Sequence, residues 1–487
     1  MERYKGRRLQ GMFAAVMAMA FFLFQLGIAE AGVSTLYPGA GNRPPKTPEW
    51  NVEKGKEEKN VSAKAAEQNG GAAKGVKKLD KKNVPMTMLS VMLGEGLASA
   101  SVSGISDFEV VDGNAGKVLE SCGANKSLNI TVDGSYIAIN GKKTKSRIVT
   151  VQAKNGADGV MKYNGSSYRG SLRLTSDGVR LQVLNQLSLE DYVKGVLPSE
   201  MSPGWHGEAL KAQAVAARTF ALYNRSKGGH KAVGYDLCGS SHCQVYSGMA
   251  AETAATNSAV DATRGQVMYY EHQVIYAAFH SSSGGATENS EDVWGVYQPY
   301  LRSVTDDDSK SPYHNWTAKF TVVQVEKQLA SAGKGVGTLK SISLSPISSS
   351  GSVTGRTASG RAYGVKFTGS SGTVTITGEQ ARTIFGLKSA MFNVRTERSV
   401  KLPAAENSKK TAAASKGSQG TFSEAPAAMN GSAMKINGSE TIVFDGHGFG
   451  HGLGLAQYGA KAMADKGSKY DDILHHYYTD VVIQEIY

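Results

Sequence analysis

The chain has 487 residues, 40% of them hydrophobic, which is enough for two or three domains or for one large enzyme core. Its net charge of +12 is uneven, because residues 1–82 hold 15 Lys/Arg against 8 Asp/Glu. No RRM, KH, homeodomain or zinc-finger pattern accompanies this charge, so we expect no nucleic-acid partner; a basic segment also suits an anionic membrane surface or a cell-wall polymer.

The first 31 residues have the pattern of an export signal. Basic residues at positions 3, 5, 7 and 8 precede an apolar stretch over residues 11–29, and an Ala-Glu-Ala pattern ends at Ala31. This pattern favours cleavage after Ala31, whereas the length of the apolar stretch also fits a retained membrane anchor. We therefore expect residues 1–31 to be a signal peptide or a membrane anchor. The protein is then exported, extracytoplasmic and associated with the cell wall or the membrane.

Two further segments have a composition that cannot bury enough apolar surface to fold. Residues 32–85 are rich in Lys, Glu, Gly, Pro, Asn and Ala, and are predicted to form a disordered basic spacer. Residues 403–437 have a similar composition. Because clear patterns resume after them, they are predicted to be a disordered insertion within a folded domain.

The folded part between these segments begins with strands and continues with helices. Alternation of apolar and polar residues predicts strands at 127–132, 147–152, 170–174 and 179–184. An Ala-rich pattern over residues 208–227, ended by Gly228, predicts a helix with Ser202-Pro203 as its N-cap and first position. The remaining predicted elements are a helix at 250–263, a hairpin of 266–270 with 274–279, a Gly-rich loop at 446–454, a helix at 455–465 and a strand at 481–486.

Glu200 lies among apolar residues at the end of the run from Asp191 to Met201. Val196, Leu197 and Met201 can wall this carboxylate, and apolar surroundings raise a carboxyl pKa because they disfavour the charged form. A Glu with a raised pKa can act as a general acid near neutral pH. The run by itself leaves a second interpretation open, in which Glu200 caps or salt-bridges the following helix.

Several blocks of sequence, taken in order, carry a family resemblance. They include Leu-Pro-Ser-Glu-Met at 197–201 and Gly-His-Gly-Leu-Gly-Leu-Ala-Gln-Tyr-Gly-Ala at 450–460, and the full set covers 168–170, 187–201, 208–220, 279–294, 299–303 and 450–460. Together they resemble the SpoIID/LytB family, stage II sporulation protein D and its relatives. The resemblance is continuous over residues 168–303 and returns from about residue 442.

This resemblance implies a lytic transglycosylase that cleaves peptidoglycan glycan strands, preferably strands that lack stem peptides, to 1,6-anhydro-N-acetylmuramic acid ends. Glu200 matches the family's catalytic acid; it would protonate the glycosidic oxygen and then accept the proton of the same sugar's C6 hydroxyl. Asp191 and Glu208, the carboxylates near it in sequence, are expected to be structural. Because the family includes amidase enhancers, a non-catalytic glycan-binding enhancer is the alternative. The expected partners are glycan strands, a cooperating amidase and a membrane surface.

The chain has three cysteines, too few for a disulfide framework. Two of them fall with two histidines in Gly- and Ser-rich sequence, in the set His230, Cys238, His242 and Cys243. Such a set could hold zinc in a closed tetrahedral site, and a Cys238–Cys243 disulfide is the alternative. Some family members bind zinc at a similar Cys-x3-His-Cys block, so the resemblance favours a structural zinc. No organic cofactor is expected.

The Gly-rich segment 445–454 is expected to approach a sugar with its backbone amides. Its His447 and His451 have no third metal ligand nearby in sequence, and it lacks the Lys-Ser/Thr ending of a phosphate-binding loop. The sequence of this segment differs from the usual family pattern at two positions. Relatives usually carry Arg where His447 stands and Ser where Ala456 stands.

Substrate contacts are predicted for a set of polar and aromatic residues in the resembling blocks: Arg218, Tyr246, His280, Ser281, Ser283, His451, Gln457 and Tyr458. Arg218 is expected to orient Glu200 or to pair with the lactyl carboxylate of N-acetylmuramic acid. Trp294 and Tyr300, with Tyr246, are candidate rings for stacking on sugars. The serines near His280 lack the Gly-x-Ser-x-Gly pattern of a nucleophilic serine and are expected to contact substrate.

The predicted fold class is α+β. A β-rich N-terminal lobe over residues 86–186 packs on a mixed α/β catalytic core over residues 187–402. Residues 438–487 are expected to complete this core and its substrate groove.

Overall fold

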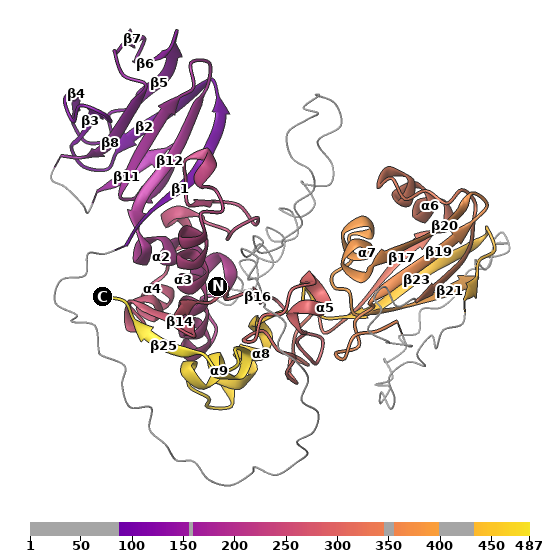
Figure 1. Ribbon diagram of the computed structural model, residues 1–487. Helices are drawn as coiled ribbons and strands as arrows, with labels where there is room; N and C mark the ends of the chain where they lie inside the picture. The colour runs from indigo at the N-terminus through magenta and orange to yellow at the C-terminus, as the bar shows by residue number, and fades with distance from the viewer. Residues whose placement is uncertain (1–86, 155–158, 345–354, 399–432) are drawn as a thin grey trace, which may run out of the picture. The chain divides into compact units, whose positions relative to one another are not determined.

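The computed structural model describes residues 87–154, 159–344, 355–398 and 433–487 (Figure 1). The predicted signal or anchor and the basic spacer lie outside these residues, as does most of the predicted insertion. Within the described stretches, no helix has both the length and the apolar character required to cross a membrane. The described chain is α+β, as predicted, with several sheets and several helices.

Two sheets form the N-terminal lobe, which is drawn in indigo and purple in Figure 1. Their strand orders are β13-β1-β12-β11-β8-β3-β4 and β10-β9-β2-β5-β6-β7. Alternate side chains of both sheets point inward and share one core, which includes Phe108, Leu128 and Val183. The four strands predicted in this region are confirmed as β5, β8, β11 and β12. The strands are β1 (Met88–Leu97), β2 (Ser99–Gly104), β3 (Phe108–Asp112), β4 (Val118–Cys122), β5 (Leu128–Asp133), β6 (Tyr136–Ile139), β7 (Lys142–Lys143), β8 (Ile148–Ala153), β9 (Val160–Tyr163), β10 (Ser166–Arg169), β11 (Ser171–Ser176), β12 (Leu181–Ser188) and β13 (Leu237–Cys238).

Helix α3 is the centre of a second core, which we call the helical core. It contacts α2, α4, α8 and α9, and its buried alanines let these helices approach closely. The prediction of a helix at 208–227 is confirmed, with Gly228 in a left-handed C-cap. Its N-cap is His206, so the predicted Ser202-Pro203 cap is wrong. The elements are α2 (Leu189–Glu200), α3 (Gly207–Lys227), η1 (Lys231–Val233), η2 (Gly248–Ala251), α4 (Ala254–Ala262), β14 (Gln266–Tyr270), β15 (Gln273–Val274), β16 (Phe279–His280), α5 (Ser290–Trp294), β24 (Leu455–Ala456), α8 (Gln457–Asp465), α9 (Tyr470–Tyr477) and β25 (Val482–Glu485).

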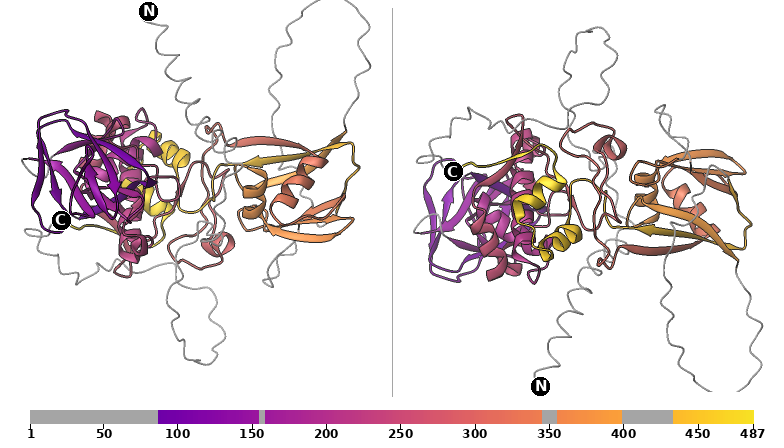
Figure 2. Two further views of the ribbon diagram at one scale, coloured as in Figure 1. Left: turned by 90° about the horizontal axis from the view of Figure 1, so that it is seen from above. Right: turned by 90° about the horizontal axis from the view of Figure 1, so that it is seen from below.

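Residues 315–398 and 433–447 contain a third hydrophobic core, and we call this part the second β lobe. Its sheets have the orders β17-β23-β21 and β20-β19-β18-β22, with α6 and α7 packed against them (Figure 2). Both helices begin at a Thr with a Gln three residues on, which forms a capping box. The elements are β17 (Asn315–Thr321), α6 (Val322–Ser331), β18 (Leu339–Leu344), β19 (Gly364–Gly369), β20 (Gly372–Thr377), α7 (Gly378–Phe385), β21 (Phe392–Arg398), β22 (Met434–Lys435) and β23 (Glu440–His447).

The second β lobe corrects two predictions. Residues 187–402 do not share one core, because Trp316, Phe367 and Phe392 belong to a cluster separate from that around α3. The described chain also resumes at residue 433 and forms β22, which pairs with β18, inside the range predicted as a disordered insertion. The predicted end of that insertion, residue 437, is therefore a few residues late.

The C-terminal segment returns from the second β lobe to the helical core. The Gly-rich segment follows β23 and leads into β24, which pairs in parallel with β16. Beyond α8 and α9, β25 pairs with β14, so the chain after residue 454 is built into the same core as α2 and α3. The predicted hairpin is confirmed in part: β15 pairs with β14 but covers only Gln273–Val274, and Phe279, predicted as the end of its second strand, belongs to β16, which pairs with β24. Helix α9 was not predicted.

Candidate active site

Glu200 is the last residue of α2, so its position depends on how that helix is held. Ser188 caps the helix, because its hydroxyl accepts from the backbone N–H of Asp191 and donates to the Asp191 carboxylate. Val193, Val196 and Leu197 are buried in the helical core. The run that ends at Glu200 is therefore itself a helix with one buried face, and Glu200 stands at its C-terminal end.

The Glu200 carboxylate is partly buried and has two neutral hydrogen-bond donors. Burial raises its pKa to about 7, against the opposing effect of the Val245 backbone N–H and the Gln457 side chain. The Val245 nitrogen lies 3.2 Å from Glu200 Oε1. No charged group of the described residues contributes to this shift. A carboxyl group with a pKa near 7 can both give and take a proton at neutral pH.

Gly195 lets the loop that carries Val245 lie directly on α2. A Cβ at this position would stand 2.4 Å from the Tyr246 ring and 3.0 Å from the carbonyl oxygen of Gly248. The backbone N–H of Ser247 donates to the Gly195 carbonyl, and the hydroxyls of Ser199 and Ser247 are 2.9 Å apart. Because Gly195 has no side chain, the loop can approach α2 closely enough for the Val245 backbone N–H to reach Glu200.

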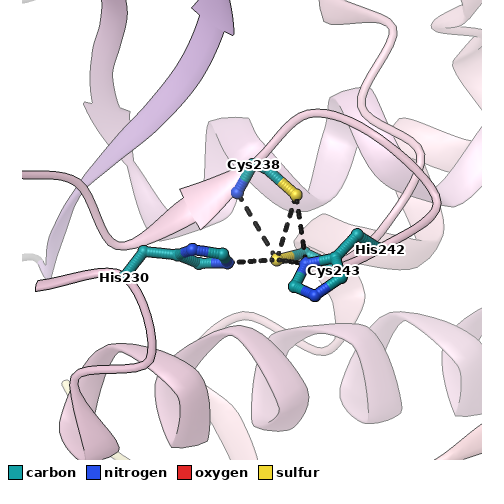
Figure 3. Close-up of side chains that lie close together, drawn as sticks. All are labelled: His230, Cys238, His242 and Cys243. Atoms are coloured by element: carbon teal, nitrogen blue, oxygen red, sulfur yellow. Dashed lines mark hydrogen bonds between the residues drawn. The ribbon is translucent and has the colours of Figure 1, made fainter. Parts of the chain in front are cut away.

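The four residues of the predicted metal set come together in one cluster, which we call the His/Cys cluster. Figure 3 shows the side chains of His230, Cys238, His242 and Cys243 turned toward one another, and one ligand atom from each lies within 4.8 Å of all the others. The two sulfurs are 3.3 Å apart, much farther than the roughly 2 Å of a disulfide. His230 Nε2 lies 3.2 Å from Cys243 Sγ, and His242 Nδ1 lies 3.6 Å from Cys238 Sγ.

Four of the six separations between these ligand atoms match the edges of a tetrahedral site. Zinc bonds of about 2.0–2.3 Å imply ligand–ligand edges of roughly 3.3–3.8 Å, and the closest pairs in the cluster are 3.2–3.7 Å apart. Two thiols and two imidazoles are also the donor types that zinc prefers. The cluster therefore has the donor set and the dimensions of a metal site.

The His/Cys cluster and Glu200 share one loop. Gln244 follows Cys243 directly; its side-chain oxygen accepts from Tyr192, and its amide donates to the Ala217 carbonyl. Val245, the next residue, donates its N–H to Glu200. The His/Cys cluster thus fixes the start of the loop that carries Val245, whose backbone N–H donates to Glu200.

The two carboxylates nearest to Glu200 in sequence have structural partners. Asp191 is two and a half helical turns before Glu200, which is about 13 Å along the axis. Glu208 pairs with Lys211 and accepts from the backbone N–H of Tyr470. Both carboxylates are therefore engaged in structural contacts.

Arg218 does not line the candidate site, and the prediction that it contacts substrate is wrong. Its side chain is 0% exposed and makes a bidentate ion pair with Glu190 at 2.7 and 2.9 Å. It also donates to the carbonyls of Val260 and Gln266. Burial raises the pKa of Glu190, but the Arg218 guanidinium and the donors from Tyr487 and Gly265 outweigh it and hold that pKa below its usual value. Arg218 fastens α3 to α2, α4 and β14.

Five other residues predicted to contact sugars are also buried. Tyr246 is 7% exposed, stacks on Tyr192 and donates its hydroxyl to Asn185, so neither face of its ring is offered to a sugar. His280 is bonded to the Leu453 carbonyl, and Ser283 donates to Asp306. The predicted sugar-stacking rings Trp294 and Tyr300 belong to the helical core. Sequence patterns did not reveal this burial, because the partners of these side chains, such as Asn185 for Tyr246 and Leu453 for His280, are distant in the chain.

The remaining predicted contacts lie near Glu200 or stay partly exposed. Gln457 reaches Glu200 and lies 3.4 Å from the side-chain oxygen of Gln213. Tyr458 is partly exposed and donates its backbone N–H to the carbonyl of Ser281. His451 is partly exposed; burial and nearby arginines lower its pKa to about 3, so its imidazole is neutral. A substrate-binding role for these residues stays a prediction.

Two contributors to this site were missed from the sequence. Val245 acts through its backbone N–H, which no side-chain pattern can indicate. Trp205, five residues after Glu200, is partly exposed and packs edge-on against Tyr458 with ring centroids 4.8 Å apart. The sequence could have indicated this ring, because a Trp in the Gly- and Pro-containing turn after Glu200 predicts an exposed ring near the carboxylate.

Comparison with known proteins identifies the region that contains Glu200 and the His/Cys cluster. A family model described as Stage II sporulation protein, SpoIID, matches residues 177–270. An uncharacterized protein of Brachyspira hyodysenteriae (strain ATCC 49526 / WA1) is 31% identical over 320 residues, covering 66% of this chain and 73% of that protein. Stage II sporulation protein D of Bacillus subtilis (strain 168) is 32% identical over 320 residues, covering 62% and 76%. The amidase enhancer of the same strain is 31% identical over 316 residues, covering 59% of this chain and 39% of the enhancer.

Proposed function

Because the chain belongs to the SpoIID family of stage II sporulation proteins and so has a cell-wall-related role, we propose that it is a lytic transglycosylase. Its substrates are peptidoglycan glycan strands, preferably strands without stem peptides, and Glu200 is its single acid and base. The observation that carries the proposal is the Glu200 pKa of about 7 at a site with neutral donors only. The protein works outside the cytoplasm, at the cell wall or membrane, on strands that an amidase has stripped.

In the proposed reaction, Glu200 first protonates the glycosidic oxygen as the bond to C1 of N-acetylmuramic acid breaks. The Glu200 carboxylate then takes the proton of that sugar's C6 hydroxyl, whose oxygen bonds to C1. Glu200 ends as it began, and no water is consumed. A hydrolase would need a second carboxylate to direct water or to form a covalent intermediate, and Asp191 and Glu208 have structural partners instead.

Product mass tests this proposal. Peptide-free glycan strands are incubated with the purified protein, and the fragments are weighed by mass spectrometry. Anhydro ends support transglycosylation, whereas fragments heavier by one water would indicate hydrolysis. Strand binding without any fragments would instead favour a non-catalytic amidase enhancer, a role carried in the name of one relative.

The rate of cleavage is expected to fall above pH 7. The acid must be protonated in the free enzyme, so kcat/KM should drop about tenfold for each pH unit above the Glu200 pKa of about 7. Gln457→Leu removes a donor that stabilises the carboxylate, which raises the pKa and moves the fall to higher pH. A Gln457→Leu profile that moved to lower pH, or a wild-type rate that rose from pH 7 to 8, would contradict this assignment.

We also propose that the His/Cys cluster holds one structural zinc ion. Four protein ligands would fill a tetrahedral coordination shell, so the ion would leave no position for substrate or water. Its contribution would be to fix the loop that carries Val245, and no step of the reaction passes through it.

Cys238→Ser is expected to abolish zinc binding and to lower thermal stability. Loss of a ligand present at 100 times its dissociation constant removes about 2.7 kcal/mol of stability. Zinc content by elemental analysis and the unfolding temperature provide the two measurements. Cys122→Ser is the matched control, because Cys122 is buried in the N-terminal lobe outside the cluster and its loss should leave zinc content unchanged. A wild-type mass two hydrogens lower, which indicates a disulfide, would contradict the zinc proposal.

A further inference from the structure

Four aromatic rings form a row that begins beside the candidate acid. Trp205 and Tyr458 have ring centroids 4.8 Å apart, Tyr458 and Tyr313 are 6.3 Å apart, and Tyr313 and Phe449 are 4.9 Å apart. All four rings are partly exposed. Neighbouring rings meet edge to face, at 61°, 81° and 68°, so the row is a tilted cluster whose partly exposed rings offer apolar surface to a ligand rather than one flat platform.

The row is continuous with the Glu200 site at one end. Tyr458 directly follows Gln457, whose side chain bonds Glu200, and Trp205 lies in the turn that follows Glu200. At the other end, Phe449 is held by paired backbone bonds with Ser282. The row therefore leads from the helical core toward residues that precede the second β lobe.

A lysine stands over the far end of the row. Lys388 Nζ lies 5.3 Å from the centroid of the Tyr313 ring and 5.5 Å from that of Phe449. Its backbone carbonyl accepts from the N–H of Gly450, which ties it to the Gly-rich segment. None of the ion pairs among the described residues includes Lys388, whereas Lys461 and Lys466 each pair with an aspartate. A cation placed on ring faces without an acidic partner can bind an anion on a ligand that lies along the rings.

We propose that Lys388 binds the free lactyl carboxylate of an N-acetylmuramic acid residue and thereby selects strands without stem peptides. The inference rests on the proposed function for its ligand class, a peptidoglycan glycan strand. The lactyl group is the anionic group of such a strand, and it is a neutral amide wherever a stem peptide is attached. Because Lys388 is several rings away from Trp205, its partner is a muramic acid distant from the one cleaved at Glu200.

Binding is measured with two glycan probes and the full-length chain. One probe is amidase-treated strands with free lactyl carboxylates, and the other is the same strands with those groups converted to methyl amides. Glu200→Gln is present in every variant of this assay so that no strand is cut. The chain with Lys388 intact is expected to bind the carboxylate strands about tenfold more tightly than the methyl-amide strands. This factor corresponds to the lower end of the free energy of a charged hydrogen bond, because the site is partly exposed.

Lys388→Met keeps the apolar stem and should remove this preference by weakening the carboxylate probe alone. Lys388→Arg should retain it. Lys366→Met is the matched control, because Lys366 is an exposed lysine on β19 in the same lobe, and its loss should leave both affinities unchanged. Equal weakening of both probes by Lys388→Met, or no preference when Lys388 is present, overturns the proposal.

Cleavage by the protein with Glu200 intact, measured separately, distinguishes the two proposals. A Lys388-dependent binding preference without cleavage would contradict the transglycosylase proposal and support the proposed Lys388 subsite. Cleavage to anhydro ends without that preference would contradict the proposed Lys388 subsite and support the transglycosylase proposal.

Discussion

Glu200→Gln is expected to lower the formation of anhydro-ended fragments by at least about a thousandfold, because one residue supplies both the acid and the base. The amide has nearly the same shape and can still accept the Val245 N–H, but it cannot give or take a proton at neutral pH. Burial already disfavours the Glu200 carboxylate, as its raised pKa indicates, so the neutral side chain should not lower the unfolding temperature at pH 7 or above. Fragment yields by mass spectrometry and thermal unfolding provide the two measurements.

Glu208→Gln is the matched control for this experiment. Glu208 is also close to the turn between α2 and α3, but it pairs with Lys211 and the backbone N–H of Tyr470. Its variant should keep most of the activity with a small loss of stability. Full activity in Glu200→Gln would remove Glu200 from the reaction, and equal losses in both variants would indicate a general disturbance of the turn.

Arg218→Met is expected to destabilise the helical core by about 3–5 kcal/mol, because it leaves the buried Glu190 without its bidentate partner. The shift in the denaturation midpoint, followed by the helical signal, measures this loss. Adding Glu190→Met should recover part of it, since two apolar side chains no longer leave one charge unpaired.

Arg225→Met is the control on the same helix. Arg225 is exposed in the last turn of α3, and its loss should change stability by no more than about 0.5 kcal/mol. If Arg218→Met left stability unchanged but raised the KM for glycan strands, the result would support the substrate contact that was expected from the sequence.

Local patterns predicted much of the fold. Strands β5, β8, β11 and β12 have clear alternation, and α3 has an Ala-rich face followed by Gly228, so each could be read from a short window. The second β lobe could not be read in this way. Its central strand β23 pairs with β17, which precedes it by more than a hundred residues, and only that long-range pairing separates its core from the helical core.

The candidate site was predictable where chemistry depends on residue type and spacing. The four members of the His/Cys cluster were found because thiols and imidazoles recur within a short loop. Arg218 and Tyr246 were misassigned because a guanidinium or a phenol looks the same in sequence whether it contacts a sugar or is buried. Their roles follow from Glu190 and Asn185, which meet them only in the folded chain.

The return of the C-terminal segment to the helical core has a kinetic consequence. Gln457 reaches Glu200 from a position separated from it in the chain by the whole second β lobe, and β25 pairs with β14 over a similar span. Contacts of such high sequence separation form late in folding. A chain emerging N-terminus first therefore presents α2 and the His/Cys loop before the surroundings of Glu200 are complete. The surroundings that set the Glu200 pKa are therefore complete only after the C-terminal segment has packed on the helical core, so in the proposed enzyme the acid becomes functional at the last stage of folding.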